Sequence, residues 1–533
     1  MNLLQKNQTI SALIVLLLTI AVYSCRKYYI DHGFRETYTN VNEVIHKDST
    51  KMPFFKVHFK NGNVSLLDTW SLNNGKDTIT GNGTLYDFNR NTLHTGELHL
   101  TINDIAIIET NEYSKILTKD NDKIAALSIL TGANAILNVV CITNPKACFG
   151  SCPTFYVDGQ TLLHNAQAEG FSSSISPSLE RQDLDALQYA TSSDEFLLIM
   201  KNEAFETHMI NELYIQAVPK NKNDHVFQDK HGSFYQCGNL LNASLATVNN
   251  TNIASRINTI DEAEYFSLTD PNKLETKEEI ILEYQGLSTN NYGLVINFRQ
   301  TLLTTFLLYN GISYMGDEVG DYFSKIETNE FIKQKLSNPF KRLGKIKLSV
   351  WNEELKIWQF IEELYETGPI AKNLVIAPLN NINQTNNKIK IKIEMTKGLW
   401  RIDLLALTTI KSETEPYTIY PNTLDIVNGN AYTISDIAKD DHYYLISFPG
   451  NEFRFKFKLP ELNNKDEFEL FLSSKGYYLE WIRKSWLKDK NLSKLKKMLL
   501  NDDKTWNELA QEFKAMEDGM ESVFWNSKFT NIQ

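Results

Sequence analysis

Lys388-Ile-Lys-Ile-Lys-Ile-Glu-Met395 alternates regularly between apolar and charged side chains. Successive side chains of a β-strand point to opposite faces of its sheet, so this alternation places the isoleucines on one face and the lysines on the other. The isoleucine face predicts contact with a core, and the lysine face predicts contact with solvent. The segment therefore indicates a half-buried strand and not a basic patch for nucleic acid.

Similar patterns recur on both sides of this segment. Residues 55–66 alternate around Asn61-Gly62, a dipeptide typical of tight hairpin turns. Further short apolar runs occur at 98–102, 280–284, 292–298, 344–351, 400–407, 443–448 and 453–459. Short strands separated by turn residues are typical of small sandwiches and barrels. We therefore expect a mainly β fold with added helices (α+β), built from several sandwich-like or barrel-like modules.

Three segments favour helices. Residues 302–323 suit an amphipathic or buried helix, and the small apolar residues of 123–140 suit a buried helix. Residues 487–520 have the composition and spacing of a helical tail. In that tail Leu492, Leu495, Leu499 and Leu500 are expected on one side, so the tail should dock on the body of the protein.

These patterns divide the chain into seven expected segments. They are a signal peptide (1–24), a linker (25–50), a small β-module (51–112), a Cys-containing α+β middle domain (113–270), a β-sandwich-like domain with an inserted helix (271–412), further strands (413–485) and a helical tail (486–533). In its pattern of strands the segment 271–412 resembles galactose-binding-type jelly-roll sandwiches. We expect its tryptophans Trp351, Trp358 and Trp400 to pack in a core, and an exposed platform for sugar rings is the alternative.

The N-terminus contains a predicted targeting signal. The apolar run from Ile10 to Tyr23 is too short to cross a bilayer as a helix, which needs about 20 residues, and suits the core of a signal peptide. It ends in Val22-Tyr23-Ser24-Cys25, which resembles the lipobox of bacterial lipoproteins. The resemblance implies that Cys25 is acylated after cleavage and anchors the chain in a membrane. A plain secretory signal and an uncleaved anchor helix are the alternatives.

The residues after Cys25 indicate on which face of the membrane the protein lies. In lipoproteins of Bacteroidetes-like bacteria, acidic residues after the lipidated cysteine direct export to the surface, whereas Arg26 and Lys27 follow Cys25 here. The resemblance therefore implies an outer-membrane protein on the periplasmic face rather than the cell surface. The sites around Ser49 and Thr78 resemble the short pattern that these bacteria O-glycosylate.

The charge of the chain excludes some partners. With 65 acidic and 54 basic residues the net charge is −11, so the chain as a whole does not attract nucleic acid. An acidic body is also weakly repelled by anionic lipid. Membrane attachment would therefore rest on the lipid anchor and not on basic residues.

Four cysteines remain after Cys25, an even number, in a compartment that favours disulfides. Cys148 and Cys152 can close a tight loop in which Gly150 supplies conformational freedom, and we expect a structural disulfide between them. A Cys₄ zinc site and a catalytic dithiol are alternatives that the spacing favours less. The pairing of Cys141 and Cys237 stays open. Cys148-Phe-Gly-Ser-Cys-Pro153 resembles a motif of uncharacterised exported bacterial proteins, from which no activity transfers.

Familiar catalytic motifs are absent from the sequence. It contains no phosphate-binding loop, dinucleotide fingerprint, His-Glu-x-x-His or Gly-x-Ser-x-Gly, and we expect no cofactor and no metal. Asp183-Leu-Asp185 is a carboxylate pair whose side chains point the same way only if the segment is a strand. Two carboxylates from anywhere in the chain can serve a glycosidase, so an enzyme stays open.

Together these features indicate a membrane-anchored envelope lipoprotein that acts as a binding or scaffolding subunit of an outer-membrane protein assembly. The alternative is a periplasmic or surface carbohydrate-active enzyme with a jelly-roll accessory module. A glycan is a possible ligand in either case.

Overall fold

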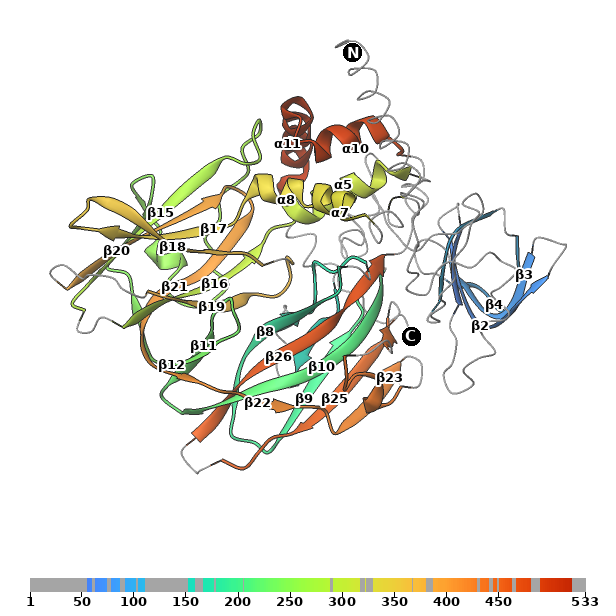
Figure 1. Cartoon of the computed structure of the whole chain (residues 1–533), viewed down its shortest axis with the longest axis horizontal. Coiled ribbons are helices and arrows are strands. Elements are labelled where there is room, and N and C mark those ends of the chain that lie inside the picture. The colour runs from blue at the N-terminus through green and yellow to red at the C-terminus, as the bar shows by residue number, and fades with distance from the viewer. Residues whose placement is uncertain are drawn as a thin grey trace, which may run out of the picture.

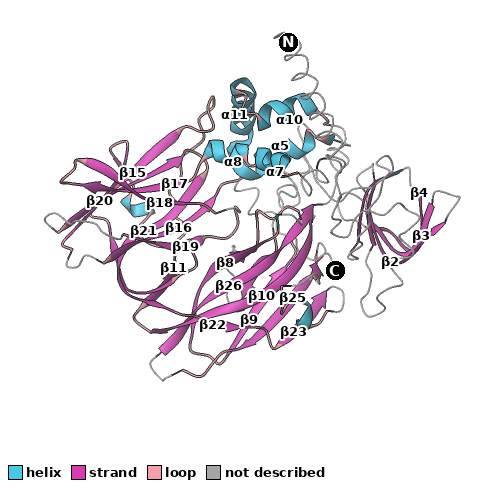
Figure 2. Ribbon diagram, in the orientation of Figure 1, coloured by secondary structure: helices cyan, strands magenta, loops and turns pink. Residues whose placement is uncertain are grey.

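The computed structural model describes two stretches of the chain. The first covers residues 55–59, 63–73, 78–86, 92–101 and 104–110. The second covers residues 152–519 except 159–165, 177–178, 205, 288–290, 317–321, 323–328, 367, 380–386, 429–431, 441–443, 448–449, 463–465 and 481–488. Strands dominate these residues and helices are few (Figure 2). The predicted mainly β fold with added helices is therefore confirmed.

The N-terminal sheet has five antiparallel strands in the order β4-β3-β2-β1-β5, in which β1 to β4 form a meander and β5 is added beside β1. Its strands are β1 (Phe55–Phe59), β2 (Val64–Asn73), β3 (Thr78–Tyr86), β4 (Thr92–Thr101) and β5 (Ile105–Thr110). Val57, Leu67 and Ile79 lie at the centre of its small apolar core. This is the small β-module that the alternating residues predict.

Two further sheets pack as a sandwich. One has the order β22-β10-β26-β8, with β24 also paired to β10, and the other has the order β23-β25-β9-β6-β7. The strands are β6 (Thr154–Val157), β7 (Ala168–Glu169), β8 (Arg181–Thr191), β9 (Glu195–Lys201), β10 (Glu206–Asn221), β22 (Tyr417–Ile419), β23 (Thr423–Asn428), β24 (Leu445–Ser447), β25 (Glu452–Lys458) and β26 (Asp466–Glu480). Phenylalanines from both sheets, including Phe196, Phe455 and Phe468, share one core.

The longest ladder of the sandwich joins distant parts of the chain. Strand β26 runs antiparallel to β10 from the pair Glu206–Glu480 to the pair Asn221–Asp466 (Figure 1). The sandwich therefore combines strands from the expected middle domain with strands from the expected segment 413–485.

The remaining strands form a closed barrel and a six-stranded sheet. The barrel order is β11-β12-β21-β16-β19, and the sheet order is β14-β13-β15-β20-β17-β18. The strands are β11 (His225–Gln228), β12 (Phe234–Asn242), β13 (Leu245–Val248), β14 (Thr251–Asn252), β15 (Lys277–Gln285), β16 (Tyr292–Gln300), β17 (Ile346–Asn352), β18 (Ile357–Leu364), β19 (Asn373–Pro378), β20 (Lys388–Thr396) and β21 (Trp400–Thr414). The alternating segment is β20, in which Ile389, Ile391 and Ile393 are buried and Lys388 and Lys390 are exposed, so the predicted half-buried strand is confirmed.

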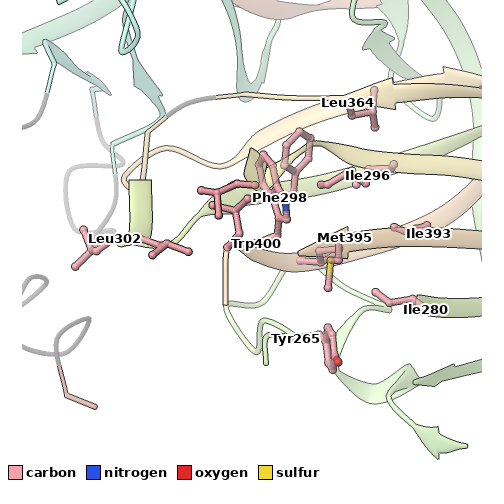
Figure 3. Packing of buried hydrophobic residues seen from close by; sticks show 14 of the residues in the cluster. Tyr265, Ile280, Ile296, Phe298, Leu302, Leu364, Ile393, Met395 and Trp400 are labelled. Atoms are coloured by element: carbon pink, nitrogen blue, oxygen red, sulfur yellow. The ribbon is translucent and has the colours of Figure 1, made fainter. Parts of the chain in front are cut away.

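The largest core lies between the barrel and the six-stranded sheet. Trp400 is 1% exposed there, and its ring meets Phe298 edge-on at 5.6 Å between centroids (Figure 3). The expectation of core packing is thus correct for Trp400. Trp351 and Trp358 are half-buried on β17 and β18 and contact each other edge-on.

The helices gather together, although they come from two distant segments (Figure 1). They are α5 (Leu303–Ser313), α7 (Glu330–Leu336), α8 (Asn338–Leu343), α10 (Leu492–Leu499) and α11 (Asp503–Glu517), with short 3₁₀ turns η4 (Ala254–Arg256) and η6 (Ile434–Asp436). Leu495 on α10 and Phe513 on α11 enter the large core, so the helical tail docks on the body as predicted. Leu500 is 55% exposed, contrary to expectation, because α10 ends at Leu499.

Membrane-spanning helices were also sought. Within the part of the chain that the structure describes, no helix combines the length and apolarity that a bilayer crossing requires.

The large core yields a stability prediction. Replacing Phe298, which is 2% exposed, with alanine should cost about 3–5 kcal/mol of unfolding free energy because it leaves a cavity beside Trp400. Phe360→Ala is the matched control, since Phe360 is 52% exposed and should cost less than about 1 kcal/mol. Urea unfolding followed by circular dichroism measures both values. Equal losses would contradict the described packing.

The sandwich carries a partly buried carboxylate, that of Glu469, which gives a pH prediction. Burial raises the pKa of Glu469 on β26 to about 7, with Lys220 at 3.7 Å opposing the shift and Glu467 adding to it. The folded protein therefore binds this proton more tightly than the unfolded chain, whose glutamates titrate near 4.3. The resulting stabilisation is complete below the unfolded pKa and is lost as the pH rises through 7.

Glu469→Gln should remove this dependence. Between pH 5 and 8 the wild-type unfolding free energy should fall by up to about 3 kcal/mol more than that of the variant. Glu415→Gln, at an exposed position, is the control and should follow the wild type. Parallel wild-type and Glu469→Gln profiles in urea titrations across this pH range would refute the prediction.

Candidate functional site

A cavity of about 690 Å³ lies where the sandwich meets the helices. Ligand sites of small molecules are usually about 300–1,000 Å³, so the cavity has the size of a binding site. Its walls come from the N-terminal ends of β8 and β10, from β26, from the loop after β18, and from α5, α7, α8 and α10. It is the candidate functional site.

Helix α5 supplies one apolar wall. Thr304, Leu308 and Ile312 recur every four residues and so form one stripe that lines the cavity, and Met315 lines it just beyond the end of the helix. Leu303, from another side of the same helix, is fully buried in the large core. A helix that is apolar all round is stable only when it is buried on all sides, which explains why α5 lies between the cavity and the core.

Helices α7, α8 and α10 complete the apolar wall. Leu336, Pro339 and Phe340 come from α7 and α8, and Leu499 comes from α10. Asn338 Nδ2 donates a 2.9 Å hydrogen bond to the carbonyl oxygen of Leu499, which ties α8 to α10.

Hydrogen bonds and a ring contact of Arg342 also fix the position of α8. Arg342 donates to Glu275 at 2.6 Å and to Asp503 at 2.8 Å, and its guanidinium stacks over Trp506. These contacts hold the helical wall as one body.

The sandwich contributes a wall with buried carboxylates, Glu169 from β7 and Glu206 from β10, and we call this the acidic wall. Glu169 Oε2 accepts hydrogen bonds from the backbone N–H groups of Ile370 (2.9 Å) and Ala371 (3.3 Å). The Glu169 carboxylate can come this close to the backbone because residue 368 is a glycine. A Cβ at Gly368, where φ is +104°, would lie 2.5 Å from Glu169 Oε2 and would clash with it.

Glu206 is fixed by a buried histidine. Its Oε2 lies 3.0 Å from His208 Nε2, and both side chains are almost fully buried. The two groups share one hydrogen bond, which fixes the Glu206 side chain. Both carboxylates of the acidic wall are therefore held in one orientation.

Cys152 and Tyr478 also line the acidic wall. The Tyr478 hydroxyl donates to the carbonyl oxygen of Ser172 at 3.0 Å. Burial raises the pKa of the Cys152 thiol well above its usual range, and the Glu169 and Glu206 carboxylates add to this shift. A reduced Cys152 would therefore be a poor nucleophile at neutral pH.

The other predicted cysteines are distributed as follows. Cys148 and Cys141 lie outside the described residues, so the disulfide between Cys148 and Cys152 stays a prediction. Cys237 is buried on β12 in a separate small core of the barrel, and burial raises its pKa to about 12. Among the described residues, no three or more His, Cys, Asp or Glu side chains are grouped as metal ligands.

The pair Asp183 and Asp185 lies on β8, so its side chains share one face, as the strand alternative requires. Both are buried, and burial raises the pKa of each; Asp183, Glu366 and Glu169 raise that of Asp185 further. Neither aspartate is among the described residues that line the cavity. The pair lies beside the site and does not form it.

Cationic side chains line other parts of the cavity. Lys333 and Lys341 come from α7 and α8. Lys345 lies between α8 and β17, is half exposed and lies 3.8 Å from Glu363. Arg181, at the start of β8, lies 3.4 Å from Glu366 and is also partly exposed. The buried acids of the sandwich therefore share the cavity with more exposed charged residues from several elements, among them Arg181 of the sandwich and Glu363 of β18.

The predicted modification sites are not brought to this cavity. Cys25 and Ser49 lie outside the described residues. Thr78 begins β3, where it pairs with Asn73 and Thr101, and its glycosylation stays a prediction.

Sequence reasoning missed Glu169 and Glu206. Each is one of 65 acidic residues, and neither stands in a recognisable motif. The one available signal is the apolar sequence after Glu206, where Met209 and Ile210 mark a buried strand in which a carboxylate is unusual.

Comparisons with known proteins add little. No protein-family model matches the chain, and no curated protein matches it. Among solved structures it is similar, over 44% of its length, to a beta-porphyranase of glycoside hydrolase family 86 from the human gut bacterium Bacteroides plebeius. The identity is 7%, the match covers 37% of that chain and the TM-score is 0.15. A likeness this low supports no argument about fold or function.

Proposed function

We propose that this protein is a lipid-anchored lipoprotein of a bacterial cell envelope and serves as a binding subunit of an outer-membrane assembly. The observation that carries the binding role is the apolar cavity of about 690 Å³ between the sandwich and the helices. The anchor rests on the resemblance of Val22-Tyr23-Ser24-Cys25 to a lipobox. Arg26 and Lys27 after the anchor favour the periplasmic face.

The chemistry of the cavity supports binding rather than catalysis. The surface of its walls is mostly apolar, with Leu308, Ile312 and Leu336 as examples, and a ligand that covers this surface gains free energy by removing it from water. The expected occupant is an apolar molecule. A membrane-bound protein has access to such molecules, because they concentrate in the bilayer.

A carbohydrate-active enzyme is the second candidate. The cavity does bring Glu169 and Glu206 together with the rings of Tyr309, Tyr365 and Tyr478, and paired carboxylates with aromatic walls are typical of glycosidases. The mainly apolar surface of the cavity argues against it, since sugars need many hydrogen-bonding partners. Co-purification from detergent-solubilised membranes discriminates the two: stoichiometric recovery with an outer-membrane partner supports the first, and glycan cleavage by a monomer supports the second.

The anchor gives a direct prediction. Cys25→Ala removes the acylated residue, and the acidic body has no other strong hold on lipid. The variant should therefore move from the membrane fraction to the soluble fraction on cell fractionation. Ser24→Ala, which keeps a small residue before the cysteine, is the control and should stay in the membrane. Retention of the Cys25 variant would count against lipidation.

The cavity gives a second prediction. Leu308→Trp places a large ring in the cavity from α5 and should weaken binding of the neutral apolar fluorophore N-phenyl-1-naphthylamine at least tenfold. Leu500→Trp makes the same change at an exposed position and should leave binding unchanged. Fluorescence titration measures both, with the thermal midpoint as a check on folding. Equal affinity in the two folded variants would rule out the cavity as the binding site.

A further inference from the structure

We infer that strand β18 is an interaction surface for a second copy of this chain, which pairs with it antiparallel about a two-fold axis at Gln359. The pairing does not depend on what the cavity binds. It follows from the place of β18 in its sheet, from its exposed apolar residues and from the charges at its two ends.

Strand β18 is an edge strand. It stands last in the six-stranded sheet, and among the described residues it pairs with β17 alone. Such an edge presents backbone N–H and C=O groups that can pair with another strand. Lys230 covers one end, since its Nζ donates to the carbonyl oxygen of Glu363 at 3.0 Å and lies 3.1 Å from the Glu362 carboxylate. Within the described structure, residues 357–361 are left to accept a partner.

This part of the edge is apolar. Ile357 is 51% exposed and Phe360 is 52% exposed, and Trp358 between them is half-buried. Edge strands usually discourage pairing with charged residues or proline, and the sequence from Ile357 to Ile361 contains neither. Exposed apolar surface of this kind indicates a site of protein interaction.

The ladder with β17 defines which side chains of β18 share a face. Ile346, Leu348 and Val350 of β17 enter the large core, so the residues that alternate with them lie on the other face. The residues of β18 opposite this other face are Trp358, Phe360 and Glu363. Ile361 is the extra residue of a β-bulge, because the register shifts between Phe360 and Glu362.

These faces permit a self-consistent register around Gln359. When Gln359 lies opposite Gln359 of a second copy, Trp358 of each copy lies opposite Phe360 of the other, on the same face. The contact between the two rings then occurs twice, as a two-fold interface requires. It covers the aromatic surface that the single chain leaves exposed.

The bulge extends this register to the charged ends of the strand. With Ile361 left unpaired in both copies, the next residues opposite each other are Ile357 with Glu362 and Lys356 with Glu363. All of these pairs again share a face, because the bulge restores the alternation that a regular strand would break.

The charges favour a second copy in this orientation. Lys356 precedes β18 and Glu363 lies near its end, and their side chains are 65% and 48% exposed. Antiparallel pairing brings Lys356 of each copy to Glu363 of the other, whereas parallel pairing would place like charges together. Their partners within the chain, Glu353 and Lys345, are themselves exposed, and such surface pairs contribute little. A peptide from another protein would not require this self-complementary charge.

A thiol at the two-fold axis tests the contact. Directly opposite residues of an antiparallel pair are close enough for a disulfide, so Gln359→Cys should crosslink two copies. Full-length protein in detergent solution is oxidised with copper phenanthroline and resolved on a non-reducing gel. The Gln359→Cys dimer should exceed that of Lys388→Cys, at an exposed position of β20 in the same sheet, about tenfold. The wild-type chain gives the background from native cysteines. A dimer yield no higher than this background, in a variant with an unchanged thermal midpoint, would overturn the inference.

Charge reversal in the Gln359→Cys chain tests the orientation. Lys356→Glu and Glu363→Lys each place like charges opposite each other and should lower the dimer yield about fivefold. The double reversal restores opposite charges and should restore the yield. It cannot act within one chain, where seven positions along a strand separate the two residues by about 23 Å. Lys456→Glu, at a 55% exposed position of β25, is the control and should keep the full yield. An unrestored yield in the double variant, or single variants that behave like this control, would contradict the antiparallel pairing.

Discussion

The antiparallel ladder between β10 and β26 is the constraint on which the rest of the structure depends. It pairs residues 206–221 with residues 466–480, and β8 is added to its other side. The ladder gives the sandwich its central pair of strands and brings Glu206 and Tyr478 to one wall of the cavity. It also sets where the C-terminal helices begin, since α10 and α11 follow β26 in the chain. The cavity therefore depends on the pairing of β10 with β26, which are distant in the sequence.

The acidic wall shows how the fold accommodates charge in a poorly solvated place. A buried carboxylate is tolerated only when donors satisfy it. Glu169 meets this condition through backbone N–H groups next to Gly368, and Glu206 meets it through His208. The buried Arg299, which donates from two nitrogens to Glu264 at 2.7 Å each, solves the same problem in the barrel with a full ion pair. That pair belongs to a larger network, because Arg299 also donates to the carbonyl oxygen of Pro369 and Arg401 lies 3.4 Å from Glu264, whereas the acidic wall borders open volume.

The sequence predicts local structure well where the period of apolar residues is clear. The isoleucines of β20 and the leucines of the tail indicate their elements because burial acts on neighbouring residues. Leu500 is misplaced because one residue beyond a helix end no longer follows the helical period. Strand pairing across more than 200 residues leaves no local pattern, so the joining of β10 to β26 could not be predicted. Glu169 and Glu206 become a site only through that pairing.

The same ladder orders the events by which the chain folds. Strand β10 has no long partner until the chain has been made as far as Glu480, so a large part of the apolar sandwich surface stays uncovered through most of synthesis. Pairings between residues so distant are slow, because the intervening chain must first lose conformational freedom. The barrel and the six-stranded sheet, whose strands all lie between residues 225 and 414, can close earlier. Within residues 152–519 we therefore expect the sandwich, and with it the cavity, to be completed after the barrel and the six-stranded sheet.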